Sequence, residues 1–255
     1  MVVKSGIERQ IQVIRHLLEN GNEPEKLKAK KLRQIQAIET FTRKKLIFSA
    51  QKLLAKDEVF TGQEDLKKML EEEGKKQWNQ YPLLIDKAFK KARISICERS
   101  QFPHLKLENG LIEIKFRHEP QLAIFYSSAG KIGECIADIP LVIAKIQKEK
   151  ERLFPTRFSG RKFLRKLFEK YQKVQEKGMG NLRDIFKQLQ EDDSTYRIDR
   201  FSSDLARLVK SGPLSIAGRS FSFQQTRDSS AGIILPGSEQ YGYISTITFT
   251  EAKYE

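Results

Sequence analysis

The tightest constraint on the fold is the dipeptide Asn109-Gly110, which lies between two runs of alternating apolar and polar residues. A period of two is typical of strands that bury one face. Asn and Gly both tolerate positive φ, which a tight turn between twisted strands requires. The pattern therefore predicts an antiparallel β-hairpin over 105–117.

Apolar residues at helical spacing precede this hairpin. The apolar residues within 7–20 lie at helical spacing and form one stripe. Asn20-Gly21-Asn22 indicates the end of this helix, and Pro24 indicates the start of the next one. The next helix is expected over 25–56, which makes 1–60 a helical hairpin. A capping box over 61–64 indicates the start of a further helix, which is expected to end at Gly74. A helix over 80–96, a strand over 121–126 and a helix over 136–148 are also expected.

The second half repeats the order of helices followed by β-prone segments. A boundary is expected at Phe154–Gly160, where Pro155 and Gly160 break the helical pattern. Helices are expected over 161–176, 182–189 and 201–209, and strands over 214–223, 232–236 and 241–250. The sequence predicts an α+β fold with an N-terminal helical hairpin and two helix-plus-small-antiparallel-sheet units, divided as 1–60, 61–153 and 154–255. The order of elements over 61–117 resembles a winged-helix module.

The charge indicates the class of partner. Lys and Arg total 47 against 33 Asp and Glu, which gives a formal net charge of +14. Residues 1–60 carry +6 and residues 121–180 carry +7, whereas residues 181–255 carry −1. Rows of cations on helices can neutralise phosphates and release condensed counterions, so two basic zones favour nucleic acid as the partner.

Four clusters on expected helices supply the candidate nucleic-acid-binding residues. The first two lie on the second helix: Lys26, Lys28, Lys30, Lys31 and Arg33, then Arg43, Lys44 and Lys45. The third lies before the hairpin: Lys87, Lys90, Lys91 and Arg93. The fourth lies over 161–173: Arg161, Lys162, Arg165, Lys166, Lys170 and Lys173.

An alternative function rests on Glu113-Ile114-Lys115. A hairpin that carries Glu-x-Lys on its second strand resembles the core of the PD-(D/E)xK nucleases. That resemblance implies Mg²⁺ held by Glu113 and a second carboxylate, with Lys115 orienting the attacking water. His104 stands where the other acid is expected, and imidazole is a poor ligand for Mg²⁺. Glu98 and Glu108 are the possible replacements.

Other chemistries lack their motifs. The sequence has no phosphate-binding G-x-x-x-x-G-K-[ST] loop and no G-x-S-x-G nucleophile elbow. Its two cysteines, Cys97 and Cys135, exclude a disulfide framework and a four-thiolate zinc site. No apolar run is long enough to span a membrane, and no secretory leader precedes the first helix.

The leading expectation is a non-enzymatic nucleic-acid-binding protein. It would bind duplex DNA, in preference to RNA, through contacts to the DNA phosphates. The hairpin over 105–117 would act as a wing. No cofactor is expected, with Mg²⁺ implied only by the nuclease alternative. A third alternative is a scaffold subunit that binds other proteins through the helical hairpin or the C-terminal unit. We expect a soluble, intracellular protein, cytoplasmic or associated with the nucleoid, without a membrane partner.

Overall fold

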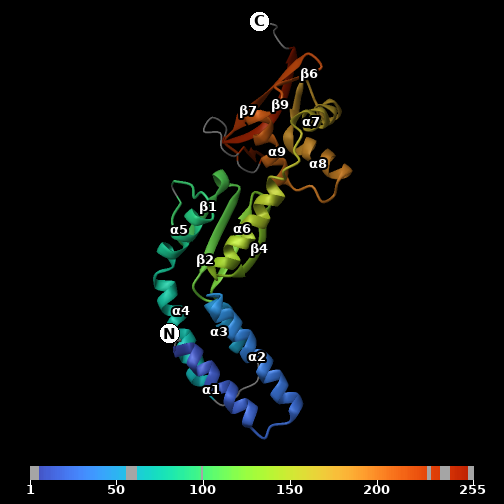
Figure 1. Cartoon of the computed structure of the whole chain (residues 1–255). Helices are drawn as coiled ribbons and strands as arrows, with labels where there is room; N and C mark the ends of the chain where they lie inside the picture. Colours follow the sequence, from blue (N-terminus) through green and yellow to red (C-terminus); the bar gives the residue numbers. More distant parts are fainter. Residues whose placement is uncertain (1–5, 56–61, 99, 229–230, 236–241, 252–255) are drawn as a thin grey trace. The chain divides into compact units, whose positions relative to one another are not determined.

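The computed structural model of the chain describes residues 6–55, 62–98, 100–228, 231–235 and 242–251 (Figure 1). The described residues form helices and two small antiparallel sheets, which confirms the α+β class. The chain divides into two compact units. The first comprises Met1–Ile94, Phe116–Ala123 and Glu134–Lys145, and the second comprises Ser95–Lys115, Ile124–Gly133 and Ile146–Glu255. The three segments expected from the sequence, with boundaries after residues 60 and 153, stay a prediction.

The helices of the first unit are α1 (Gly6–Asn20), α2 (Glu25–Arg43), α3 (Ile47–Leu54), α4 (Gln63–Asn79) and α5 (Tyr81–Lys91). The antiparallel pair expected at the N-terminus is present as α1 and α2, which lie side by side (Figure 1). The apolar stripes of α1 to α4 share one core: Ile11, Ile14, Leu18, Ile35, Ile38, Ala50, Leu54, Leu66 and Leu70. This core includes residues on both sides of the boundary expected at residue 60.

The single helix expected over 25–56 is wrong, because two helices occupy this stretch. α2 ends at Arg43, Lys45 adopts a left-handed φ of 57°, and α3 begins at Ile47. No Gly or Pro marks the break in the sequence, and the apolar period continues across it. The carboxylate of Asp138 instead stabilises the new start, since it accepts hydrogen bonds from the backbone N–H groups of Phe48 and Ser49.

The hairpin expected over 105–117 is confirmed by β1 (His104–Leu107) and β2 (Ile112–Arg117), which are antiparallel, with Leu107 opposite Ile112. A 3-10 turn, Glu108–Gly110, joins them, and Gly110 has a φ of 90°. β3 (Leu122–Ser127) matches the expected strand, whereas β4 (Gly130–Ile136) was not expected. The sheet has the order β1-β2-β3-β4, so the hairpin is half of a four-stranded sheet and the winged-helix resemblance is not confirmed. Helix α6 (Ile139–Leu153) follows.

In the second unit, α7 (Gly160–Val174), α8 (Leu182–Asp192) and α9 (Ile198–Ser211) match the three expected helices. The three expected β-prone stretches supply β6 (Ser215–Ile216), β7 (Arg219–Thr226), β8 (Ile233–Ile234) and β9 (Tyr243–Glu251). One short strand, β5 (Met179–Asn181), was not expected. The order is β5-β9-β7-β6, and β8 also pairs with β9. Aromatic and aliphatic side chains of the helices and of β9 form one core, which includes Phe163, Leu167, Phe201, Ile247 and Phe249.

The lengths and compositions of the helices bear on membrane insertion. Among the described residues, no helix is both long enough and apolar enough to cross a bilayer.

Candidate nucleic-acid interface

Helix α7 separates apolar and basic residues onto opposite faces. Phe163, Leu164, Leu167 and Tyr171 are buried in the core of the second unit. The side chain of Ser159 caps the start of the helix by accepting a hydrogen bond from the backbone N–H of Lys162 at 3.3 Å. Because its apolar face is fixed in the core, the helix holds its cations on the outside.

Five of the six basic residues expected on this helix are exposed: Arg161, Lys162, Arg165, Lys166 and Lys173. We call these five residues the α7 basic face. Spacings of three or four residues place Arg161, Lys162, Arg165 and Lys166 next to one another on the helix surface, and Lys173 follows about two turns later. Within the described part of the chain, Arg161, Lys162 and Arg165 form no salt bridge, so their charge is available to a partner.

The sixth residue, Lys170, does not belong to this face. Its side chain is buried, and its ammonium group forms a 2.8 Å salt bridge with Asp192 at the end of α8. The hydrogen bond from Lys170 holds the pKa of Asp192 below its usual value, and the charges of Lys166 and Lys173 lower it further. The expectation that Lys170 contacts a phosphate is corrected: it is committed to an internal ion pair.

The basic cluster expected on α2 also divides into exposed and committed residues. Lys31 is buried and forms a 2.7 Å salt bridge with Glu23, which corrects its assignment to a free basic face. Lys28 donates to the backbone carbonyl of Glu19, and Arg43 pairs with Glu39. The exposed cations of this region are Lys26, Lys30, Arg33, Arg43, Lys44 and Lys45.

The cluster near the end of α5 is exposed. Lys90 pairs with Asp86 one turn earlier at 2.8 Å, in an exposed pair of the kind that contributes little to stability. The remaining exposed members are Lys87, Lys91 and Arg93. Of these four cations, Lys90 alone pairs with a carboxylate of its own helix among the described residues, so the cluster keeps a net positive charge.

The residues of the nuclease alternative, Glu113 and Lys115, lie on β2. Glu113 lies opposite Lys106 in the hairpin, and the ammonium group of Lys115 is 3.6 Å from the Glu113 carboxylate. Glu108, one of the possible replacement ligands, forms a 2.7 Å salt bridge with Lys150. Among the described residues, no group of three or more His, Cys, Asp or Glu could hold a metal ion. These contacts give the nuclease alternative no support.

The turn expected to form a wing belongs to the second unit and makes contacts within it. Glu108 is tied to Lys150, and Leu111, which follows the turn, is buried. The role of this turn as a wing stays a prediction.

A network of buried charges in the second unit was not expected from the sequence. Asp199 of α9 is fully buried and accepts two hydrogen bonds from the Arg152 guanidinium, at 2.7 and 3.1 Å, and one from the Ser127 hydroxyl at 2.8 Å. Burial raises the pKa of Asp199, but the hydrogen bonds from Arg152 and Ser127 outweigh it and hold the pKa below its usual value. Asp199 is therefore ionised at neutral pH and fixes the Arg152 side chain.

Helix α9 also binds the carbonyl groups at the end of α6. Arg200 donates to the carbonyl of Arg152 at 2.7 Å, and the Ser203 hydroxyl donates to the carbonyl of Leu153 at 2.8 Å. Arg207 donates to the carbonyl of Pro155 at 3.0 Å. The first two bonds satisfy carbonyls that the end of α6 leaves free, and the third fixes the segment that leads into α7.

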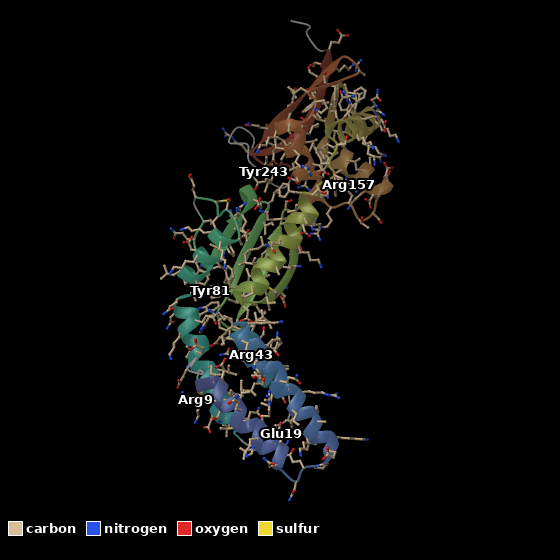
Figure 2. The ribbon with its side chains drawn as sticks, in the orientation of Figure 1. Arg9, Glu19, Arg43, Tyr81, Arg157 and Tyr243 are labelled. Carbon is tan, nitrogen blue, oxygen red and sulfur yellow. The ribbon has the colours of Figure 1, made fainter. Side chains whose placement is uncertain are left out.

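This segment and α9 border an open groove of about 780 Å³. Figure 2 labels Arg157, which lies in the groove lining on the segment between α6 and α7. The basic lining residues are Arg152, Arg157, Lys162, Lys166, Arg197 and Arg200, and the acidic ones are Asp192, Asp193 and Asp204. Two members of the α7 basic face, Lys162 and Lys166, thus also line the groove. Sequence analysis missed Arg152, Arg197 and Arg200, because only the packing of α9 brings them beside α7.

No family model, curated protein or solved structure matches the chain.

Proposed function

We propose that this protein binds nucleic acid through phosphate contacts made by the α7 basic face. The observation that supports the proposal is the exposed, largely unpaired charge of Arg161, Lys162 and Arg165 on a helix anchored by its opposite face. A helix of 15 residues is about 22 Å long. Duplex DNA carries one charge per about 1.7 Å of its axis, so the face is long enough to meet several phosphates.

Phosphate contacts position a protein on a duplex without reading its sequence. The proposed function is that of an intracellular protein that binds DNA. It requires no cofactor and does not cleave the DNA. Further predicted phosphate contacts are Lys30, Arg33, Arg43, Lys44, Lys45, Lys87, Lys90, Lys91 and Arg93. Lys28 is expected to make a weaker phosphate contact, because its ammonium group already donates to a backbone carbonyl.

Binding of a blunt duplex across a salt series tests the proposal. The logarithm of affinity should fall linearly with the logarithm of salt concentration. The double variant Arg161→Gln, Arg165→Gln should weaken binding and reduce the magnitude of the slope by up to about 2, because each lost phosphate contact removes about 0.9.

Lys67→Gln with Lys68→Gln is the matched control, because it removes the same charge from exposed positions of α4. The control should keep the wild-type slope. Absent binding at low salt, or a slope that both double variants change equally, would overturn the assignment to α7. The same duplex incubated with Mg²⁺ or Mn²⁺ should stay intact. Cleavage that disappears in Glu113→Ala would establish the nuclease alternative instead.

A further inference from the structure

The open groove of the second unit has the dimensions of a ligand site. Its volume of about 780 Å³ lies within the range of about 300–1,000 Å³ that is usual for small-molecule pockets. Its walls come from the end of α6 and the segment before α7, from α7 itself, from the end of α8, from the connection between α8 and α9, and from the beginning of α9. All of these elements are held by the core and by the hydrogen bonds of α9 described above.

The groove contains cations that are not used internally. Arg152 is committed to Asp199, and Arg200 is committed to Asp204 at 3.1 Å. In contrast, within the described residues Arg157 and Lys162 form no salt bridge, and both are exposed. These two side chains can reach an anion in the groove without breaking an existing pair.

Arg197 adds a third cation with an unused donor. Its Nη2 atom is 3.5 Å from the carboxylate of Asp199, which is a long contact for a salt bridge. Its Nε atom is buried and has no hydrogen-bond partner among the described residues. An unsatisfied buried donor costs free energy. The Arg197 side chain as a whole is partly exposed and lines the groove, so its guanidinium can meet an anion there.

The carboxylates of the groove are already engaged. Asp192 binds Lys170, Asp204 accepts a hydrogen bond from the Tyr196 hydroxyl at 2.8 Å, and Asp193 accepts from Thr195. These three carboxylates therefore neutralise only part of the positive charge of the groove. The charged groups on its walls that remain without a partner among the described residues are basic.

Two aromatic side chains lie among these cations. Phe158 and Tyr196 both line the groove. The guanidinium of Arg207 covers one face of the Phe158 ring at 4.3 Å, so a base would have to stack on the other face of that ring. The hydrogen bond to Asp204 fixes the orientation of the Tyr196 ring. Rings beside a basic groove are the combination that proteins use to hold single-stranded nucleic acid, since every base has a face that can stack.

We propose that this groove binds an unpaired nucleotide, with its phosphate at Arg157, Lys162 and Arg197 and its base against Phe158 or Tyr196. The inference rests on the proposed function, because Lys162 belongs both to the groove and to the α7 basic face. A fully paired duplex can meet the face, but its bases are stacked and cannot enter the groove. An acidic peptide would meet the same cations without using the aromatic rings. The groove therefore favours a DNA end or junction with unpaired nucleotides over a continuous duplex.

The test compares two ligands that differ in one feature: a blunt duplex, and the same duplex with a short single-stranded overhang that carries 2-aminopurine. The wild-type protein should bind the overhang ligand about tenfold more tightly at equal salt concentration. Stacking on an aromatic ring should also quench the fluorescence of the 2-aminopurine.

Two double variants with equal loss of charge separate the groove from the face. Arg157→Gln with Lys162→Gln should remove the preference for the overhang and the quenching, and it should also weaken duplex binding because Lys162 belongs to both surfaces. Arg161→Gln with Arg165→Gln should weaken binding to both ligands alike and keep the preference, since neither residue lines the groove. Tyr196→Leu, checked for folding by circular dichroism, should reduce the quenching if Tyr196 is the stacking ring, and Phe158→Leu should do so if it is Phe158.

The outcomes distinguish the two proposals. Duplex binding with a steep salt slope but without preference or quenching would overturn the groove assignment and leave the proposed function standing. Absence of binding to every nucleic acid would overturn both. Displacement of the overhang ligand by polyglutamate at equal charge, without any quenching by the wild-type protein, would assign the groove to an acidic peptide.

Discussion

The carboxylate of Asp138 accepts a hydrogen bond of 2.9 Å from the backbone N–H of Ser49, a residue 89 positions earlier in the chain. It accepts a second bond from the backbone N–H of Phe48 at 3.0 Å and a third from the Ser49 hydroxyl. The residue at the N-cap of α3 is Leu46, whose side chain cannot cap a helix. Asp138 therefore provides from a distant segment the cap that the local sequence lacks.

Replacement of Asp138 by Ala should destabilise the first unit. The variant loses a helix cap and leaves buried N–H groups unpaired, so the free energy of unfolding should fall by about 2 kcal/mol. Urea unfolding measures the loss. Asp86→Ala, which breaks an exposed pair with Lys90, is the control and should change stability by less than about 0.5 kcal/mol. Equal effects of the two substitutions would contradict the role given to Asp138.

Asp199→Asn should remove a pH-dependent contribution to stability. The pKa of Asp199 is lowered in the folded protein, so its ion pair with Arg152 stabilises the fold above the ordinary carboxyl pKa and is lost as the pH falls through the lowered one. At neutral pH the variant should be less stable by about 3 kcal/mol, as expected for a broken buried ion pair. Urea unfolding at several pH values should show this difference narrowing toward acid. A difference that grows toward acid would refute the assignment.

Lys170 and Lys173 should behave differently although both belong to α7. Lys173→Gln removes an exposed cation and should reduce the magnitude of the salt slope for DNA by about 0.9. Lys170→Gln removes the partner of Asp192 and should lower the urea midpoint while it leaves the slope nearly unchanged. The prediction fails if Lys170→Gln lowers the slope as much as Lys173→Gln does.

The break between α2 and α3 can be tested at Lys45, whose φ is 57°. Glycine adopts left-handed φ without the steric cost that a side chain incurs, so Lys45→Gly should raise the free energy of unfolding by about 0.5 kcal/mol. The matched control is Lys44→Gly, because Lys44 has a φ of −82°. This variant should lower the free energy of unfolding by about 0.5–1 kcal/mol. Thermal unfolding of both variants measures the contrast. Equal losses would show that a continuous helix exists there in solution.

Local patterns predicted the elements that depend on neighbours in the chain. The alternation around Asn109-Gly110 predicted the hairpin, and the stripe of Phe163, Leu167 and Tyr171 predicted α7 with its basic face. Strand β4 was missed because its burial is mixed and its apolar residues do not alternate regularly. Strand β5 has three residues around Gly180, too few for any period to show.

The candidate site was predicted only in part. Sequence reasoning identified the cations of α7, but it treated Lys31 and Lys170 as exposed because helical spacing does not reveal a carboxylate on another element. Glu23 and Asp192 supply those carboxylates. The groove was missed for the same reason, since its lining residues are spread from Arg152 to Asp204.

The sequence by itself determined the α+β class, the hairpin and the segregation of charge onto helices, because these depend on periodicity and turn chemistry within short stretches. Only the tertiary structure decided which cations remain free. An ion pair between distant residues forms when packing brings them within a few ångströms, and packing also collected Arg157, Lys162 and Arg197 around one groove. The net charge of +14 thus defined a class of partner, whereas the fold defined the surface that can meet it.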